Sequence, residues 1–282
     1  MRRRQKGKKK HGLRNLLILF VICIGFYYSQ FWWITPQEAH FVSAELPAAF
    51  EGFRVVQISD LHGKEFGRDS EVLLKTVAAQ KPDIIAITGD LVDLKTDWSI
   101  LPPLLNGLSE LAPTYFVTGN HEWTLRQNLP AALELIRSCG VTVLENQFLI
   151  LEREGAQIAL CGIHDPNGRA DQKTPQALSA EVPEGMFTLL LAHRNEHQRD
   201  YLNYDLTLVG HAHGGIVRLP FTDGLVDTQM DWFPSYTSGF YELESGVAMF
   251  VSRGLGETPR FGLRLFNRPH LPVIVLGSAS TS

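Results

Sequence analysis

The stretch Gly210-His211-Ala212-His213-Gly214-Gly215 follows directly on the apolar run of residues 206–209. An extended segment places side chains i and i+2 on the same face, so a strand over 206–209 delivers both imidazoles together at its end. The flanking glycines leave room for the backbone and a ligand to approach closely. A turn with two incidental histidines is the alternative, so the interpretation depends on whether the chain repeats this arrangement.

Four other stretches repeat it, each placing metal-ligand residues after an apolar segment. They are Asp60-Leu61-His62, Gly89-Asp90, Gly119-Asn120-His121-Glu122 and Ala192-His193. The hydrophobic periodicity of the first half predicts strands over 53–59, 83–88 and 114–118, alternating with helices over 71–80, 98–111 and 129–138. This order predicts parallel strands with right-handed crossovers. Open α/β sheets have their active sites at the carboxyl ends of strands, where all these residues would lie.

The second half of the chain is predicted to be richer in strands. They are expected over residues 141–143, 148–151, 157–163, 187–191, 206–209, 240–243, 248–252 and 271–276. Between them, residues 219–239 carry several aromatic side chains without periodicity. A loop of that length is functional or disordered, and its aromatic content favours a flap that faces a substrate.

The net charge of −4 averages two unlike regions of the chain. Residues 1–34 hold eight Lys or Arg residues and no acid, which leaves 18 basic and 30 acidic residues in the remainder, a net charge of −12. An acidic body lacks the clustered positive charge that binds a nucleic-acid backbone. We therefore expect no nucleic-acid partner, and the charge disfavours a nuclease.

Residues 16–34 form an uncharged apolar segment, close to the roughly 20 residues that span a bilayer. Aromatic residues gather at its far end, as expected at a membrane interface: Tyr27, Tyr28, Trp32 and Trp33. We predict a basic cytoplasmic tail over 1–15, a single-pass signal anchor over 16–34, a tether over 35–50 and one domain over 51–278. The basic run would keep the N-terminus in the cytoplasm and send the domain across the cell membrane. A signal peptide cleaved near Val42-Ser43-Ala44 is the alternative.

The candidate ligands are carboxylate, amide and imidazole groups without cysteine: Asp60, His62, Asp90, Asn120, His193, His211 and His213. Such a set suits Mn²⁺, Fe or Zn²⁺ in a reactive site better than a structural zinc site, which usually contains thiolates. Seven ligands exceed the needs of one ion, and two ions can share them if one carboxylate bridges. Asp90 is the natural bridge because its strand is expected to lie between the others. We expect two divalent ions, Mn²⁺ first, with Fe or Zn²⁺ as alternatives.

These motifs, in this order, resemble the calcineurin-like metallophosphoesterase superfamily over about residues 53–276. The N-terminal anchor, Gly-His-x-His-Gly-Gly and Ser252-Arg253-Gly254-Leu255-Gly256 resemble its bacterial branch of UDP-2,3-diacylglucosamine pyrophosphatase-like phosphodiesterases. The resemblance implies an α/β fold, a four-layer α/β/β/α sandwich, here with an N-terminal transmembrane helix. It also implies that the first ion is held by Asp60, His62, Asp90 and His213, and the second by Asp90, Asn120, His193 and His211.

The resemblance further implies hydrolysis of phosphoester or pyrophosphate bonds. Two ions lower the pKa of a bridging water and clamp the phosphoryl oxygens, so that hydroxide attacks in line. His121 would protonate the leaving oxygen as general acid, and Asp93 would orient His121. A carboxylate without that role is the alternative for Asp93. Two departures from the branch bear on substrate preference: Arg194-Asn195 follows His193, and Ile216 follows Gly-Gly.

A lipid-linked phosphoester or pyrophosphate is the expected substrate, because anchor and tether confine the site to the membrane-proximal layer. Trp232, Phe233 and Tyr236 would take up its apolar chain, since each large aromatic side chain can bury 150–250 Å². Arg253 is a further candidate substrate-binding residue. A soluble phosphodiester is the second candidate substrate, and a catalytically silent binding protein on the same fold is the alternative function. The oligomeric state is not predicted.

Overall fold

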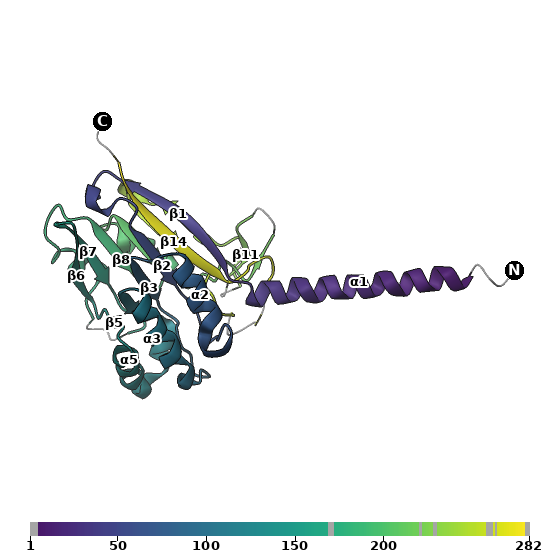
Figure 1. Cartoon of the computed structure of the whole chain (residues 1–282). Coiled ribbons are helices and arrows are strands. Elements are labelled where there is room, and N and C mark those ends of the chain that lie inside the picture. The colour runs from purple at the N-terminus through teal and green to yellow at the C-terminus, as the bar shows by residue number, and fades with distance from the viewer. Residues whose placement is uncertain are drawn as a thin grey trace.

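The computed structural model describes residues 5–168, 172–219, 222–227, 230–257, 262 and 264–279, with the backbone alone for residues 5–11 and 245. Two six-stranded sheets form the body of the protein (Figure 1). The strand order is β1-β14-β2-β3-β4-β5 in the first sheet and β12-β13-β9-β8-β7-β6 in the second. A small hairpin is formed by β10 (Val217–Arg218) and β11 (Gly224–Val226).

The first sheet contains three parallel apolar strands at its centre, covered by helices on its outer face. Its strands are β1 (Thr35–Ser43), β2 (Arg54–Ile58), β3 (Ile84–Thr88), β4 (Thr114–Val117), β5 (Thr142–Val143) and β14 (His270–Ser278). The covering helices are α2 (Glu71–Ala79), α3 (Leu101–Leu111) and α5 (Leu129–Ser138). Since helices cover one face and the second sheet the other, β3 is buried at all five residues, as its unbroken apolar run predicts.

The second sheet packs its inner face against the first. Its strands are β6 (Gln147–Arg153), β7 (Ala156–Gly162), β8 (Thr188–Leu191), β9 (Leu206–Val209), β12 (Gly239–Glu242) and β13 (Ala248–Val251). The inter-sheet core joins Val55 and Ala86 of the first sheet to Leu189, Leu208 and Phe250 of the second. On the outer face, α6 (Pro175–Ser179) and the 3₁₀ segment Asn195–Tyr201 complete the fourth layer. The predicted α/β/β/α sandwich is therefore confirmed.

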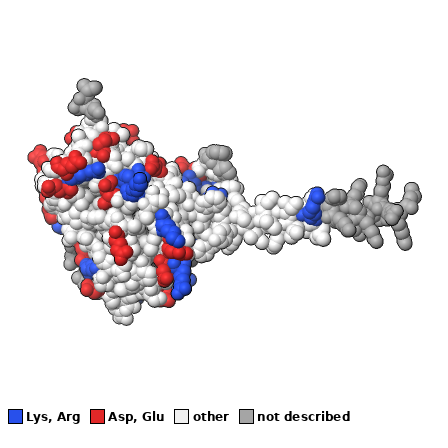
Figure 2. All heavy atoms as spheres, viewed as in Figure 1, with Lys and Arg blue, Asp and Glu red and all other residues white. Residues whose placement is uncertain are grey.

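The helix α1 (Gln5–Trp32) projects from the body as a rod (Figure 1). Within the described residues it is the one helix long and apolar enough to cross a membrane, over Gly12–Trp32. Figure 2 shows an uncharged surface along α1 from the body to a basic residue at the limit of the described side chains. Residues 1–4 of the predicted basic tail lie outside the described residues.

The tether predicted over residues 35–50 was wrong, because residues 35–43 form a strand of the first sheet and Ala48–Phe50 a 3₁₀ turn with Phe50 buried in the core. Strand β1 pairs in parallel with β14 over nine residues, from Thr35 opposite His270 to Ser43 opposite Ser278. Pro36 is tolerated because β1 is an edge strand. Local patterning could not reveal this strand, because its partner is the last strand of the chain. The body therefore begins at residue 35, directly after α1, and cleavage near Ser43 would remove β1.

Candidate metal centre

The candidate ligands lie where strands of both sheets end, and their backbone is unusual. Five of the seven have positive φ angles: Asp60 (50°), His62 (50°), Asp90 (52°), His211 (64°) and His213 (48°). The left-handed region is rarely occupied by residues other than glycine, and each such residue costs on the order of 1–3 kcal/mol. Strain of this kind clusters at functional sites and requires support from the surrounding structure.

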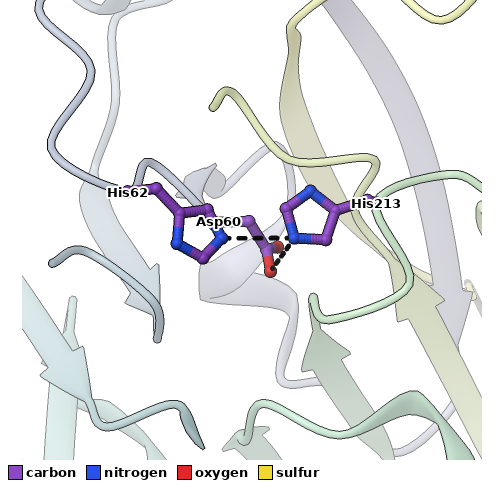
Figure 3. A group of neighbouring side chains, drawn as sticks. All are labelled: Asp60, His62 and His213. Atoms are coloured by element: carbon purple, nitrogen blue, oxygen red, sulfur yellow. Dashed lines mark hydrogen bonds and ion pairs between the residues drawn. The ribbon is translucent and has the colours of Figure 1, made fainter. Parts of the chain in front are cut away.

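Asp60, His62 and His213 form the first cluster, which Figure 3 shows with both imidazoles turned toward the carboxylate. Nε2 of His62 and Nε2 of His213 are 3.2 Å apart, and Nε2 of His213 is 3.5 Å from Oδ1 of Asp60. The Asp60 carboxylate also accepts a hydrogen bond from the His211 backbone N–H. Gly210 permits this close approach, because a Cβ there would lie 2.4 Å from Oδ2 of Asp60.

Asp90, His193 and His211 form the second cluster, with Asn120 beside it. Nε2 of His193 lies 3.2 Å from Nδ1 of His211, 3.3 Å from Oδ2 of Asp90 and 3.1 Å from Oδ1 of Asn120. The opposite ring nitrogen of His193 bonds the Thr88 carbonyl oxygen at 2.8 Å, which fixes the ring orientation. Four side chains from four separate stretches thus converge on one point.

Asp90 faces both clusters with the same oxygen. Its Oδ2 lies 3.3 Å from Nε2 of His193 in the second cluster and 3.9 Å from Nε2 of His62 in the first. Its other oxygen accepts a hydrogen bond from the His121 backbone N–H at 2.8 Å. Oδ2 is therefore directed between the clusters, as the sequence argument for a bridging carboxylate requires.

The donor geometry of both clusters fits divalent metal ions. Two nitrogen ligands about 2.0–2.1 Å from one ion lie roughly 2.8–3.0 Å apart in octahedral (cis) coordination and roughly 3.3–3.4 Å apart in tetrahedral coordination. The His62–His213 and His193–His211 nitrogen pairs are each 3.2 Å apart. Metal binding also requires neutral imidazole. Burial lowers the pKa of His62 to about 4. For His193, burial is outweighed by the neighbouring Asp90 and Asp60 carboxylates, which raise its pKa to about 10, so the His193 ring would have to release a proton when an ion binds. The carboxylate, amide and imidazole donors contain no thiolate, which matches a catalytic rather than a structural metal site.

The fully buried Glu122 supports this centre, and the sequence argument gave it no role. Its carboxylate accepts hydrogen bonds from the backbone N–H groups of Gly119 (2.7 Å), Asp90 (3.0 Å) and Val92 (3.0 Å). It thereby joins the end of β3 to the start of α4 (Asn120–Thr124). The spacing is that of a capping box, with Glu at N3, but glycine at the N-cap in place of Ser or Thr conceals the signal.

His121 and Asp93 lie beside the first cluster. Together with His62 they form a third group whose ligand atoms lie within 4.8 Å of one another. The His121 ring stands edge-on to the His62 ring, with 4.7 Å between the ring centres. The Asp93 carboxylate accepts hydrogen bonds from the Lys95 N–H and the Thr96 hydroxyl, which hold it in place. The two residues predicted to act together are therefore neighbours.

The four predicted substrate-binding residues do not line one common cavity. Tyr236 lines a cavity of about 480 Å³ that also borders His211. Trp232 and Phe233 are 69% and 74% exposed and are not among the residues that line this cavity. The Arg253 guanidinium lies 3.5 Å from the Gln37 side-chain oxygen of β1.

The last turn of α1 contacts the loops that carry the first cluster. Gln30, which is 3% exposed, accepts a hydrogen bond from the Asn267 backbone N–H at 3.0 Å. The Asn267 side chain donates to the carbonyl oxygens of His213 (2.6 Å) and Gly215 (3.0 Å). Nζ of Lys64, two residues after His62, lies 4.8 Å from the centre of a Trp32 ring. A tether over residues 35–50, as the sequence predicts, excludes both contacts, because it would separate α1 from the body.

Comparison with known proteins agrees with this site. Residues 53–215, more than half of the chain, match the family described as calcineurin-like phosphoesterase. The chain belongs to this family and is a metal-dependent phosphoesterase.

Among individual relatives, it is 30% identical to the phosphodiesterase YaeI of Escherichia coli, covering 79% of this chain and 82% of that protein. It is 28% identical to the uncharacterized metallophosphoesterase YkuE of Bacillus subtilis, covering 88% and 87%. It is 29% identical to a transmembrane protein with metallophosphoesterase domain of Danio rerio, covering 83% of this chain and 55% of that protein.

Proposed function

We propose that the protein is a membrane-anchored phosphodiesterase that uses two divalent ions. Asp60, His62, Asp90 and His213 would hold the first ion, and Asp90, Asn120, His193 and His211 the second. The observation that carries this proposal is the position of Asp90 Oδ2, which is 3.3 Å from a nitrogen of one cluster and 3.9 Å from a nitrogen of the other. Mn²⁺ is the first choice of metal on the donor types, with Fe or Zn²⁺ as alternatives.

Such a pair of ions, when bound, lowers the pKa of water and neutralises charge on the phosphoryl oxygens. The chain supplies the remaining chemistry. His121 would donate a proton to the leaving oxygen, because its ring borders the first cluster and its backbone N–H is held by Asp90. Asp93 would keep the His121 ring oriented, since both belong to one group within 4.8 Å.

A lipid-linked phosphoester or pyrophosphate is the proposed substrate, and the topology of the first sheet supports it. Strand β1 starts three residues after α1 and runs parallel to β14, which is antiparallel to β2. The body therefore meets α1 at the edge where β2 ends and Asp60 and His62 follow. If α1 crosses the cell membrane with its basic end in the cytoplasm, this edge faces the outer surface of the bilayer.

A double variant tests the proposed substrate class. Trp232→Ala/Phe233→Ala should reduce kcat/KM more on a lipid phosphoester in mixed micelles than on bis-p-nitrophenyl phosphate. The variant Val42→Ala is the matched control, because Val42 is an exposed apolar residue at the far end of β1. Equal losses on both substrates, or no loss on either, would contradict a lipid-linked substrate without touching the metal-dependent chemistry.

A further inference from the structure

The segment around Phe266 extends along the side of α1. The Phe266 ring, 45% exposed, packs against the Phe26 ring with 5.2 Å between their centres. Phe26 lies six residues before Trp32, the end of α1, which is about 9 Å along the helix axis. Phe26 is also inside the stretch Gly12–Trp32 that is long and apolar enough to cross a membrane. The body therefore overlaps the membrane-compatible part of α1.

Further exposed apolar side chains are connected to this segment. Leu265 bridges Val217 of β10, β10 pairs with β11, and Val226 of β11 bridges Trp232. We call the exposed apolar residues of these segments the apolar rim; they are Leu219 (48%), Met230 (49%), Trp232 (69%), Phe233 (74%) and Phe266 (45%). Exposed apolar side chains on segments that pair with one another, beside an apolar helix, mark a contact with a membrane or a partner.

Basic side chains accompany the rim. The Arg268 guanidinium lies 4.8 Å from a Trp33 ring centre. Lys64 also contacts the rings of Phe31 and Trp32, but its side chain is largely buried and paired with Glu257 at 3.3 Å. Tryptophan paired with Lys or Arg is typical of the headgroup layer of a bilayer, and a cation such as Arg268 attracts anionic lipids. The body as a whole is acidic, but where it meets α1 it has aromatic side chains with a guanidinium beside them.

We propose that the apolar rim inserts into the interfacial layer of the bilayer that α1 spans, so that the metal centre opens onto the membrane surface. This inference rests on the proposed membrane anchoring by α1. The bilayer is favoured over a protein partner because the rim is continuous with α1 through the Phe26–Phe266 contact. The metal centre is close by, because Asn267 follows Phe266 and bonds the His213 carbonyl oxygen.

Photocrosslinking of the full-length chain in phospholipid nanodiscs tests the inference. The crosslinker p-benzoylphenylalanine replaces Leu19, Phe233 or Val42, one at a time, and the nanodiscs carry radiolabelled phosphatidylglycerol and phosphatidylcholine. Leu19 is an exposed residue of α1 and reports whether α1 lies in lipid. Val42 is the matched control, 62% exposed and seven residues along β1 from Thr35, about 23 Å away.

We expect lipid label at Leu19 and Phe233 and none above background at Val42. Label at Leu19 without label at Phe233 would overturn the inference and leave the anchoring intact. No label at Leu19 would overturn the anchoring and the inference together. A crosslink from Phe233 to protein instead of lipid, or equal lipid label at Phe233 and Val42, would also overturn the membrane-facing rim.

Discussion

Replacing Gln30 by leucine should weaken metal binding, although Gln30 lies in the last turn of α1 and is not a candidate ligand. Gln30 is buried, and its side-chain oxygen accepts the hydrogen bond of the Asn267 backbone N–H. Leucine has a similar size but no acceptor, so this N–H would lose its partner. A buried donor left unpaired costs about 1–3 kcal/mol. The segment can escape this cost by moving to reach water.

Such a movement would break the two bonds from the Asn267 side chain to the loop that carries His213. Metal binding would then have to return the loop to its native position, which leaves the Asn267 N–H unpaired again and costs about 1–3 kcal/mol. This corresponds to a weakening of the first metal site by roughly 5- to 150-fold, since 1.4 kcal/mol is a factor of ten. The second cluster should be less affected, because Asn267 bonds the backbone of His213 and Gly215 and not that of His193 or His211.

The assay is titration of metal into the metal-free full-length protein in detergent, by chelator competition, with the unfolding temperature measured in parallel. Phe26→Ala is the matched control, because it removes the contact of α1 with Phe266 but no hydrogen bond to the segment. Phe26→Ala should lower the unfolding temperature while both metal affinities stay at wild-type values. A Gln30→Leu variant that is less stable but binds both ions with unchanged affinity would refute the reasoning.

Three further predictions follow from the site and its surroundings. His121→Ala should keep both ions and lose roughly 10²–10⁴-fold in kcat on a phosphodiester with a poor leaving group. The loss should be smaller when the leaving group is p-nitrophenolate, which needs no proton, and equal losses on both substrates would argue against an acid role. Asp93→Asn should lower kcat in the same leaving-group-dependent way but by less, which steady-state kinetics on the same two substrates would check. Burial, with Arg253, Arg264 and Arg218 nearby, holds the pKa of His270 well below 6.5. The unfolded chain then binds one more proton than the folded chain below pH 6.5, so the free energy of unfolding should fall as the pH falls. His270→Asn should reduce the slope of the free energy of unfolding against pH, measured by urea unfolding, by up to about 1.4 kcal/mol per pH unit.

The fold was predictable where the signal is local. The unbroken apolar run that became β3 and the helical spacing that became α5 required no distant partner to be recognised. Strand β1 was missed because its pairing with β14 joins residues more than 200 positions apart. The small β10–β11 hairpin was missed because it lies within and just before residues 219–239, where the sequence has no periodicity.

The convergence of the candidate ligands was predictable from the sequence, but the contacts that hold these side chains in place were not. The motifs of the candidate ligands can be recognised in the sequence because each follows an apolar strand. The structure brings all seven side chains together. The supporting contacts carry no such signal. Glu122 acts through three backbone N–H groups, and Asn267 acts through two carbonyl oxygens, so neither role depends on a recognisable motif.

The metal content of Asp90→Ala, measured beside that of the wild type, tests the central claim most directly. The full-length proteins would be loaded with Mn²⁺, freed of unbound ions and analysed by plasma mass spectrometry, and their hydrolysis of bis-p-nitrophenyl phosphate would be measured. Because Asp90 faces both clusters, we predict two ions and activity in the wild type, and less than one ion without activity in Asp90→Ala. Two ions retained in Asp90→Ala, or hydrolysis by the metal-free wild type, would contradict a metal centre built around a shared Asp90.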